Sequence, residues 1–175
     1  MSRKHHDPVP EFSRPIEVDR IPRTGSHEKL RADAPECERL ARRLAVPRLH
    51  ALSADLHAAP WRGGGLKLTG QLTADLDQVS VVSLEPFRST VTFPVERYYL
   101  PEAEASADAG EEADPIRHGV VDLGEAVAET LALELDPYPR RAGEVFAADP
   151  ANPSEDEPPP PSPFSALGKL HKKGR

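Results

Sequence analysis

The sequence predicts an α+β fold in which a small antiparallel sheet, a meander or a partly closed barrel, packs with two helices. Three observations predict this fold. Apolar and polar residues alternate along successive stretches between residues 52 and 99, as they do in half-buried strands. Two other stretches, one on each side, place apolar residues at helical spacing behind a capping residue. The length of 175 residues fits one compact domain with tails, and we place this domain at residues 12–140.

The first elements are an arm, a strand and a helix. Residues 1–11 are polar and rich in proline and histidine, so we expect a disordered arm, and apolar residues between 12 and 21 predict a strand. Asp33 and Glu36 form a capping-box pattern, and the helix that it begins ends before Pro47. One face of this helix is basic and is either a solvated surface or a candidate contact for RNA or a partner: Arg39, Arg42 and Arg43.

The central stretch predicts three or four antiparallel strands. Even positions are apolar at residues 52–58 and 66–76, and WRGGG at 61–65 predicts the turn between them. The apolar positions change parity across Asp77-Gln78, which predicts a turn or a bulge there. Odd positions are apolar from residue 87 to 99, and Pro94 within this run predicts an edge strand or a bulge.

The last third of the chain is acidic and rich in proline. Residues 101–118 lack a pattern and predict a disordered insertion. Order returns at Val120, and Asp122 with Glu125 predicts a second helix, which ends at Asp136-Pro137. Nine prolines between 137 and 163 predict an extended linker over 141–163, and residues 164–175 form a basic amphipathic tail.

Charge and cysteine content exclude several classes of protein. The net charge is −7, and residues 101–163 carry −13 while residues 164–175 carry +4. A chain with this balance does not coat a nucleic-acid backbone by charge alone, so we expect it to recognise a specific assembled particle. The single cysteine, Cys37, excludes an internal disulfide framework and a zinc ribbon. No signal-like or membrane-spanning run is present, so we expect a cytoplasmic protein with neither membrane nor DNA as a partner.

We find no residue pattern for catalysis, metal binding or a cofactor. The seven histidines form no HxxxH pair, no serine lies in a GxSxG turn, and Gly63-Gly64-Gly65 lacks the GK[ST] ending of a phosphate-binding loop. The acidic residues at 102–114 lie in sequence that we expect to be disordered, which does not hold two carboxylates at a fixed separation. We therefore expect a non-enzymatic protein, with a hydrolase or an RNA-processing enzyme as the weaker alternative.

Five stretches in this order carry a family resemblance: PEFSRPIEVDRIP (10–22), LTADLDQVSVVSLEPF (72–87), VERYYLPE (95–102), DLGEAVAETLALELDPYPR (122–140) and PFSALGKLHKK (163–173). Together they resemble the YceD-type large ribosomal RNA subunit accumulation proteins, in particular their alphaproteobacterial branch. The resemblance implies a bacterial factor for accumulation of the large-subunit (23S) ribosomal RNA, acting in ribosome biogenesis without catalysis. Ser80 and Ser83 stand where many relatives carry cysteine, so no zinc role is carried over.

The resemblance also implies candidate interaction residues at three places. Glu85, Pro86 and Phe87 form either a turn with a core phenylalanine or a contact surface. Arg97 and Tyr98 end the long strand, and Tyr98 is either a plain surface tyrosine or a residue that stacks on an RNA base or a partner side chain. The tail is either a docking module or a frayed end, and its candidates are Phe164, Leu167, Lys169, Leu170, Lys172 and Lys173.

The partner that we expect is a precursor of the large ribosomal subunit, contacted through its RNA or its proteins. The alternative is an adaptor that binds a ribosomal protein without touching RNA. In that case the acidic residues at 101–114 would engage the basic surface of that protein.

Overall fold

The computed structural model describes residues 10–102 and 113–144. The elements are β1 (Pro15–Glu17), a 3-10 turn (Val18–Arg20), β2 (Ser26–Arg31), α1 (Ala34–Arg43), β3 (Arg48–Trp61), a second 3-10 turn (Arg62–Gly64), β4 (Gly65–Val79), β5 (Pro86–Pro101), β6 (Asp114–Ile116), β7 (Val120–Asp122) and α3 (Leu123–Glu134). All of them belong to one compact unit that ends at Ala142. The predicted α+β class, with a mostly antiparallel sheet and two helices, is confirmed.

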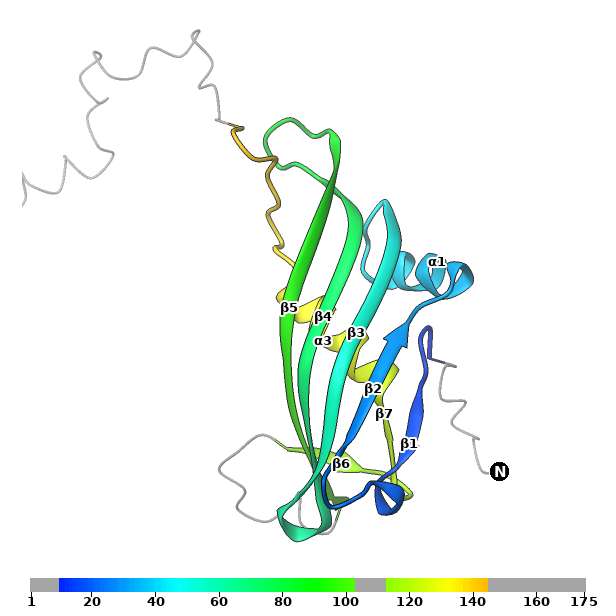
Figure 1. The fold of residues 1–175 in the computed structure, drawn as a ribbon. Helices are drawn as coiled ribbons and strands as arrows, with labels where there is room; N and C mark the ends of the chain where they lie inside the picture. Colours follow the sequence, from blue (N-terminus) through cyan, green and yellow to red (C-terminus); the bar gives the residue numbers. More distant parts are fainter. Residues whose placement is uncertain (1–9, 103–112, 145–175) are drawn as a thin grey trace, which may run out of the picture. The chain divides into compact units, whose positions relative to one another are not determined.

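The main sheet has the strand order β2-β3-β4-β5-β6, and β1 pairs with β7 in a separate two-stranded sheet (Figure 1). Strands β2 to β5 are antiparallel neighbours in chain order, which is a meander. Strand β6 runs parallel to β5 and pairs with it only over Tyr99–Pro101. In the described residues β5 is therefore an open edge from Pro86 to Tyr98, and an edge strand is the position in a sheet that tolerates a proline such as Pro94. The edge position predicted from Pro94 is confirmed.

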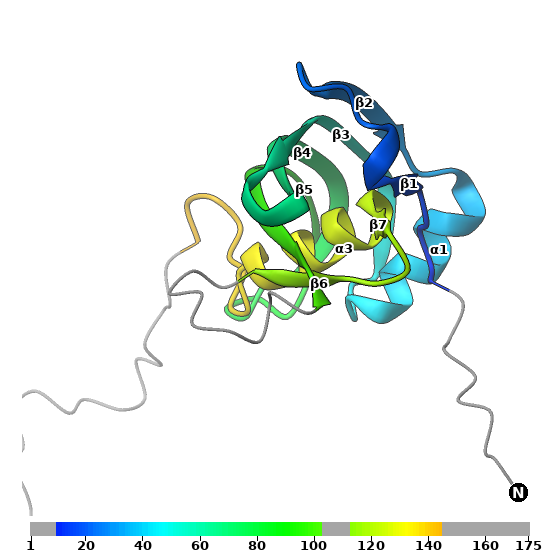
Figure 2. The ribbon, with the colours of Figure 1, turned by 90° about the horizontal axis from the view of Figure 1, so that it is seen from below.

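The core lies between the concave side of the sheet and α3. Figure 2 shows β3, β4 and β5 curving around this helix. Even-numbered residues of β3 and β4 point inward and include Leu56, Leu68 and Leu72, while Val127 and Leu131 of α3 meet them from the other side. We call this side of the sheet the inner face and the opposite side the outer face. Burial of each such leucine contributes about 2 kcal/mol before the entropy of ordering is subtracted.

Both helices begin where the sequence predicts, but only α1 forms the full capping box. In α1 the Asp33 carboxylate accepts from the Glu36 backbone N–H at 2.8 Å, and Glu36 accepts from the Asp33 N–H at 2.8 Å. In α3 the Asp122 carboxylate accepts from Gly124 N–H at 2.9 Å. A Cβ at Gly124 would lie 2.5 Å from the Phe12 carbonyl oxygen. Glycine at this position lets the N-terminal segment cross the first turn of α3 and bury Phe12.

One prediction about the strands is wrong, and one strand was missed. The parity change at Asp77-Gln78 makes no break, because β4 continues to Val79 and its inner position is filled by Gln78, which accepts from the Ser89 hydroxyl at 2.8 Å. The register shift lies in β3 instead, between Leu49 and Ala51. Strand β2 was not predicted, since only Leu30 in SHEKLR is buried and backbone pairing to β3 defines this edge strand.

Two predicted boundaries also change. The strand expected over residues 12–21 is only β1, followed directly by a 3-10 turn. The insertion predicted over 101–118 is wrong for residues 114–116, which pair with β5 as β6. Pro101, at the start of that insertion, belongs to β5, and Arg117 near its end forms a bridge with Val120. Residues 103–112 of the insertion lie outside the described residues, as do residues 1–9 of the arm and residues 145–175 of the linker and tail.

Candidate functional site

The basic face of α1 is largely engaged within the fold. Arg43 forms ion pairs with Glu125 at 2.6 Å and with Glu11 at 3.0 Å, and the hydrogen bond with Glu125 raises its pKa. Arg39 donates to the Glu11 carbonyl at 3.1 Å. Arg42 is exposed and donates to the Glu38 carbonyl at 3.3 Å. Of these three candidates, Arg42 is the one whose side-chain hydrogen bond to another described residue stays within α1.

Arg97 also has a structural environment. Its side chain lies on the inner face and donates to Asp114 at 2.6 Å and to Glu129 at 2.9 Å, which joins β5 to β6 and α3. Burial lowers the pKa of Arg97, but the hydrogen bonds with Asp114 and Glu129 outweigh that effect, and the pKa is raised. Arg97 is therefore paired with two carboxylates on the inner face, and its side chain is absent from the outer face of the sheet.

The turn that contains Glu85 and Pro86 joins the segment that follows α3. The Val81 backbone N–H donates to the Pro139 carbonyl at 3.0 Å, and Arg141 lies 3.6 Å from Glu85. These contacts bring together the SLEPF and DPYPR stretches, which are about fifty residues apart in the sequence. Phe87 is half-buried and lies outside the core cluster, so the interpretation of Phe87 as a core residue is wrong.

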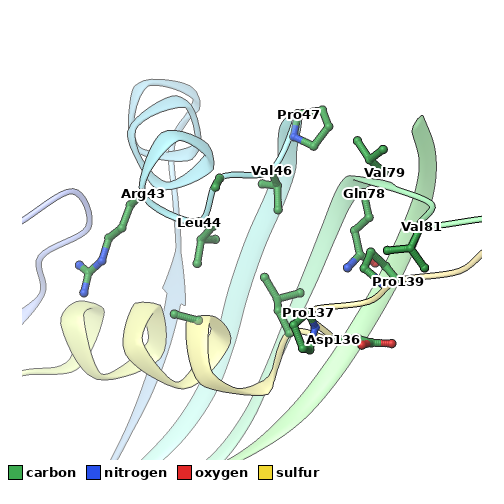
Figure 3. A pocket seen from close by; sticks show the side chains of 13 residues that line it. Arg43, Leu44, Val46, Pro47, Gln78, Val79, Val81, Asp136, Pro137 and Pro139 are labelled. Atoms are coloured by element: carbon green, nitrogen blue, oxygen red, sulfur yellow. The ribbon is translucent and has the colours of Figure 1, made fainter. Parts of the chain in front are cut away.

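An apolar groove of about 430 Å³ lies beside this junction (Figure 3). We call it the hairpin groove. Most of its lining is apolar and comes from the segment after α1, the end of β4 with the loop that follows it, and the end of α3 with the segment that follows it: Leu44, Val46, Pro47, Val79, Val81, Ala132, Leu135, Pro137 and Pro139. Its polar lining residues are Arg43, Gln78 and Asp136, of which Gln78 is only 8% exposed. Mostly apolar walls with a few polar groups are typical of a binding site.

The tip of the same hairpin exposes a strained apolar residue. Leu84 is 77% exposed and has a φ of 59°, in the left-handed region that costs a leucine about 1 kcal/mol. Ser80, which is fully buried, holds the loop, because its hydroxyl accepts from the Val82 N–H at 3.1 Å and its carbonyl accepts from the Leu84 N–H at 2.9 Å. A strained and exposed leucine adds nothing to the core, and such residues cluster at functional sites.

Tyr98 lies at the other end of β5, on the outer face. Its ring centroid is 4.8 Å from that of Trp61, and its hydroxyl donates to Glu96 at 2.7 Å. Tyr99 is buried, which confirms that the two tyrosines point to opposite sides. Twelve residues of β5 separate Pro86 from Tyr98, about 40 Å along a strand, so the candidate residues form two separate surfaces.

Sequence patterns did not single out several residues of these surfaces. Leu84, Val81 and Gln78 were seen only as parts of a turn or of a parity change, and Trp61 as part of a turn. Their positions in the two surfaces depend on contacts between segments that are distant in the sequence, such as the hydrogen bond from Val81 to Pro139. The tail candidates from Phe164 to Lys173 lie outside the described residues. Within the described ranges, no three histidine, cysteine, aspartate or glutamate side chains are grouped to hold a metal ion, and no helix is long and apolar enough to cross a membrane.

Comparison with known proteins gives one family match. The model of the family described as large ribosomal RNA subunit accumulation protein YceD matches residues 68–171, which is more than half of the chain. The matched range contains Tyr98 and the groove residues from Gln78 to Pro139, but not those at the end of α1, residues 43–47. Neither the curated proteins nor the solved structures contain a match.

Proposed function

The chain belongs to the YceD family of large ribosomal RNA subunit accumulation proteins. We propose that it promotes this accumulation by binding a precursor of the large ribosomal subunit, without catalysing a reaction. The observation that carries the proposal is the hairpin groove together with the exposed Leu84. Exposed apolar surface is typical of a docking site, and so is a residue with a strained backbone such as Leu84.

The occupant that this groove fits is an apolar segment of a protein in the precursor. Its walls are apolar and its rim includes Val79 and Val81, each 42% exposed. Phosphate would require a cluster of cations, whereas the groove lining contains a single arginine, Arg43, which is paired with Glu125. The groove therefore accounts for attachment to the particle and leaves any contact with RNA to another surface.

Two exposed leucines make a matched test of this proposal. Leu84 and Leu133 are 77% and 81% exposed, and neither lines the groove. Leu84 belongs to the hairpin loop that contributes Val81 to the groove, whereas Leu133 lies on α3. We expect Leu84→Ala to weaken co-sedimentation of the tagged full-length chain with large-subunit precursors by about fivefold or more, as truncation of an interface anchor does. Leu133→Ala should leave it unchanged. Equal effects, or recovery of the wild type only in ribosome-free fractions at low and moderate salt, would overturn the proposal.

The tail and the adaptor alternative need separate measurements. We expect removal of residues 164–175 to weaken precursor binding in a salt-dependent way, because this segment carries four cations and no acidic group. The second candidate function is an adaptor that binds a ribosomal protein without contact with RNA, and the apolar lining of the groove favours it. Crosslinking in cells distinguishes the two, since an adaptor captures a ribosomal protein and no RNA.

A further inference from the structure

The outer face of the sheet carries a cluster of aromatic and cationic side chains at the end opposite to the hairpin groove. The rings of Trp61 and Tyr98 are in contact with an interplanar angle of 50°. The Arg62 guanidinium lies 4.4 Å from the centre of the Trp61 ring, and the Lys67 ammonium lies 5.0 Å from the centre of the Tyr98 ring. We call these four residues the aromatic platform.

The fold places the platform where no helix of the described chain covers it. Both helices pack on the inner face, and Figure 1 looks onto the outer face of β3, β4 and β5. Trp61 pairs with Gly65 and Tyr98 pairs with Lys67, so the two rings reach each other across β4. A Cβ at Gly65 would lie 2.3 Å from the Tyr99 carbonyl oxygen, so the close approach of β4 to β5 at this point requires glycine.

The charges around the rings favour an anionic ligand with flat apolar groups. Lys67 pairs with Glu96 at 3.0 Å, but the Glu96 side chain is 58% exposed, more than the 29% of Glu125 in the Arg43 pair, so a phosphate can replace it as the partner of Lys67. Arg62 is exposed at the turn that follows Trp61. Half-buried rings that are already oriented by cations lose little freedom when a further planar group stacks on them.

We propose that the aromatic platform binds single-stranded RNA, with bases stacking on Trp61 and Tyr98 and the backbone phosphates meeting Arg62 and Lys67. Unpaired bases splayed onto aromatic side chains of a sheet are a common mode of RNA recognition. The proposal rests on the proposed function, because it names ribosomal RNA in the precursor as the partner of a second surface. It also explains why the groove and the platform lie at opposite ends of β5, since each meets a different component of the particle.

The chain offers its own optical probe for a test. Trp61 is the single tryptophan, so its fluorescence reports on the platform alone. The probe ligand is a mixed-sequence single-stranded RNA of about 12 nucleotides, titrated into the full-length chain at about 50 mM and about 200 mM salt. We expect quenching of Trp61 at the lower salt and a weaker affinity at the higher salt.

Variants separate stacking from a structural role. We expect Tyr98→Ala, and Trp61→Ala read by anisotropy of labelled RNA, to lose about 10- to 100-fold in affinity, while Tyr98→Phe retains binding because it keeps the ring. Tyr138→Ala is the matched control, since Tyr138 is 69% exposed and follows α3, away from the platform. Urea unfolding of each variant checks that the fold is intact.

The outcomes also separate this inference from the proposed function. The platform assignment is overturned if the wild type does not bind the RNA at the lower salt, if Tyr138→Ala loses as much affinity as Tyr98→Ala, or if Trp61 responds to large-subunit proteins and not to RNA. Unchanged co-sedimentation of Tyr98→Ala with precursors, together with the absence of RNA binding by the wild type, would leave the groove proposal standing. Loss of RNA crosslinks in Tyr98→Ala but not in Leu84→Ala supports the platform.

Discussion

Replacement of Arg43 by glutamine tests whether the arginines of α1 serve the fold or a ligand. Arg43 joins three segments, because its guanidinium donates to Glu125 at 2.6 and 2.9 Å and to Glu11 at 3.0 Å. Its side chain is 30% exposed, so its ion pair is intermediate between a surface pair and a buried pair. A surface pair contributes less than about 1 kcal/mol to stability, and disruption of a buried pair costs about 3–5 kcal/mol. We therefore expect Arg43→Gln to lower the free energy of unfolding by about 1–2 kcal/mol.

Urea unfolding followed by circular dichroism measures this change. With a slope of about 2 kcal/mol per molar urea, the midpoint should fall by about 0.5–1 M. Arg42→Gln is the matched control, because the exposed Arg42 has no carboxylate partner in the described residues, and it should change stability by less than about 0.5 kcal/mol. A double-mutant cycle with Glu125→Gln should recover most of the Arg43 effect as coupling. Equal stability of the two arginine variants would refute the assignment of Arg43 to the fold.

Three further predictions follow from individual environments. Leu84→Gly should raise the free energy of unfolding by about 0.5–1 kcal/mol, because glycine adopts a φ of 59° without strain. The same variant should weaken precursor binding. Urea titration measures the first effect and co-sedimentation the second, and a loss of stability would contradict the strain argument. Glu36→Gln should lower the free energy of unfolding by about 1–3 kcal/mol near pH 7, and this difference from the wild type should shrink as the pH falls below about 4. The reason is that the hydrogen bond from Arg14 lowers the pKa of Glu36 below its unfolded value. The stabilisation is therefore present above the unfolded pKa and is lost as the pH falls through the folded pKa. A pH-independent difference in urea stability would contradict this. Cys37 is 5% exposed, and burial raises its pKa. A thiol reagent should therefore modify Cys37 at least about 100-fold more slowly in the native chain than in denaturant. Fast labelling of the native chain would show instead that α1 opens.

The parts of the fold that could be predicted are those whose signal is local. The capping box of α1 and the apolar stripe of α3 are read from residues three or four apart, and the alternation of β3, β4 and β5 is read from every second residue. Strand β2 has one buried residue, Leu30, and its pairing with β3 supplies the order that its own sequence does not indicate. Strand β6 depends on contact with the end of β5, which is likewise not visible in its three residues.

The candidate surfaces could be predicted only in part for the same reason. Tyr98 was placed on the solvent side by the parity of its strand. That Trp61 meets it depends on the register between β3, β4 and β5, which no single stretch encodes. Arg43 and Arg97 looked like free cations because their carboxylate partners, Glu125 and Glu129, come from a helix far along the chain. Charge patterns in a sequence show where cations are and not whether the fold pairs them.

The measurement that tests the central claim most directly is co-sedimentation of the tagged full-length chain with large-subunit precursors, followed by crosslinking of the bound fraction. We predict that the wild type is recovered with precursors, that Leu84→Ala is largely released into ribosome-free fractions, and that Leu133→Ala behaves as the wild type. Recovery of the wild type only in ribosome-free fractions at both low and moderate salt would contradict the claim that this protein supports accumulation of large-subunit RNA by binding its precursor particle.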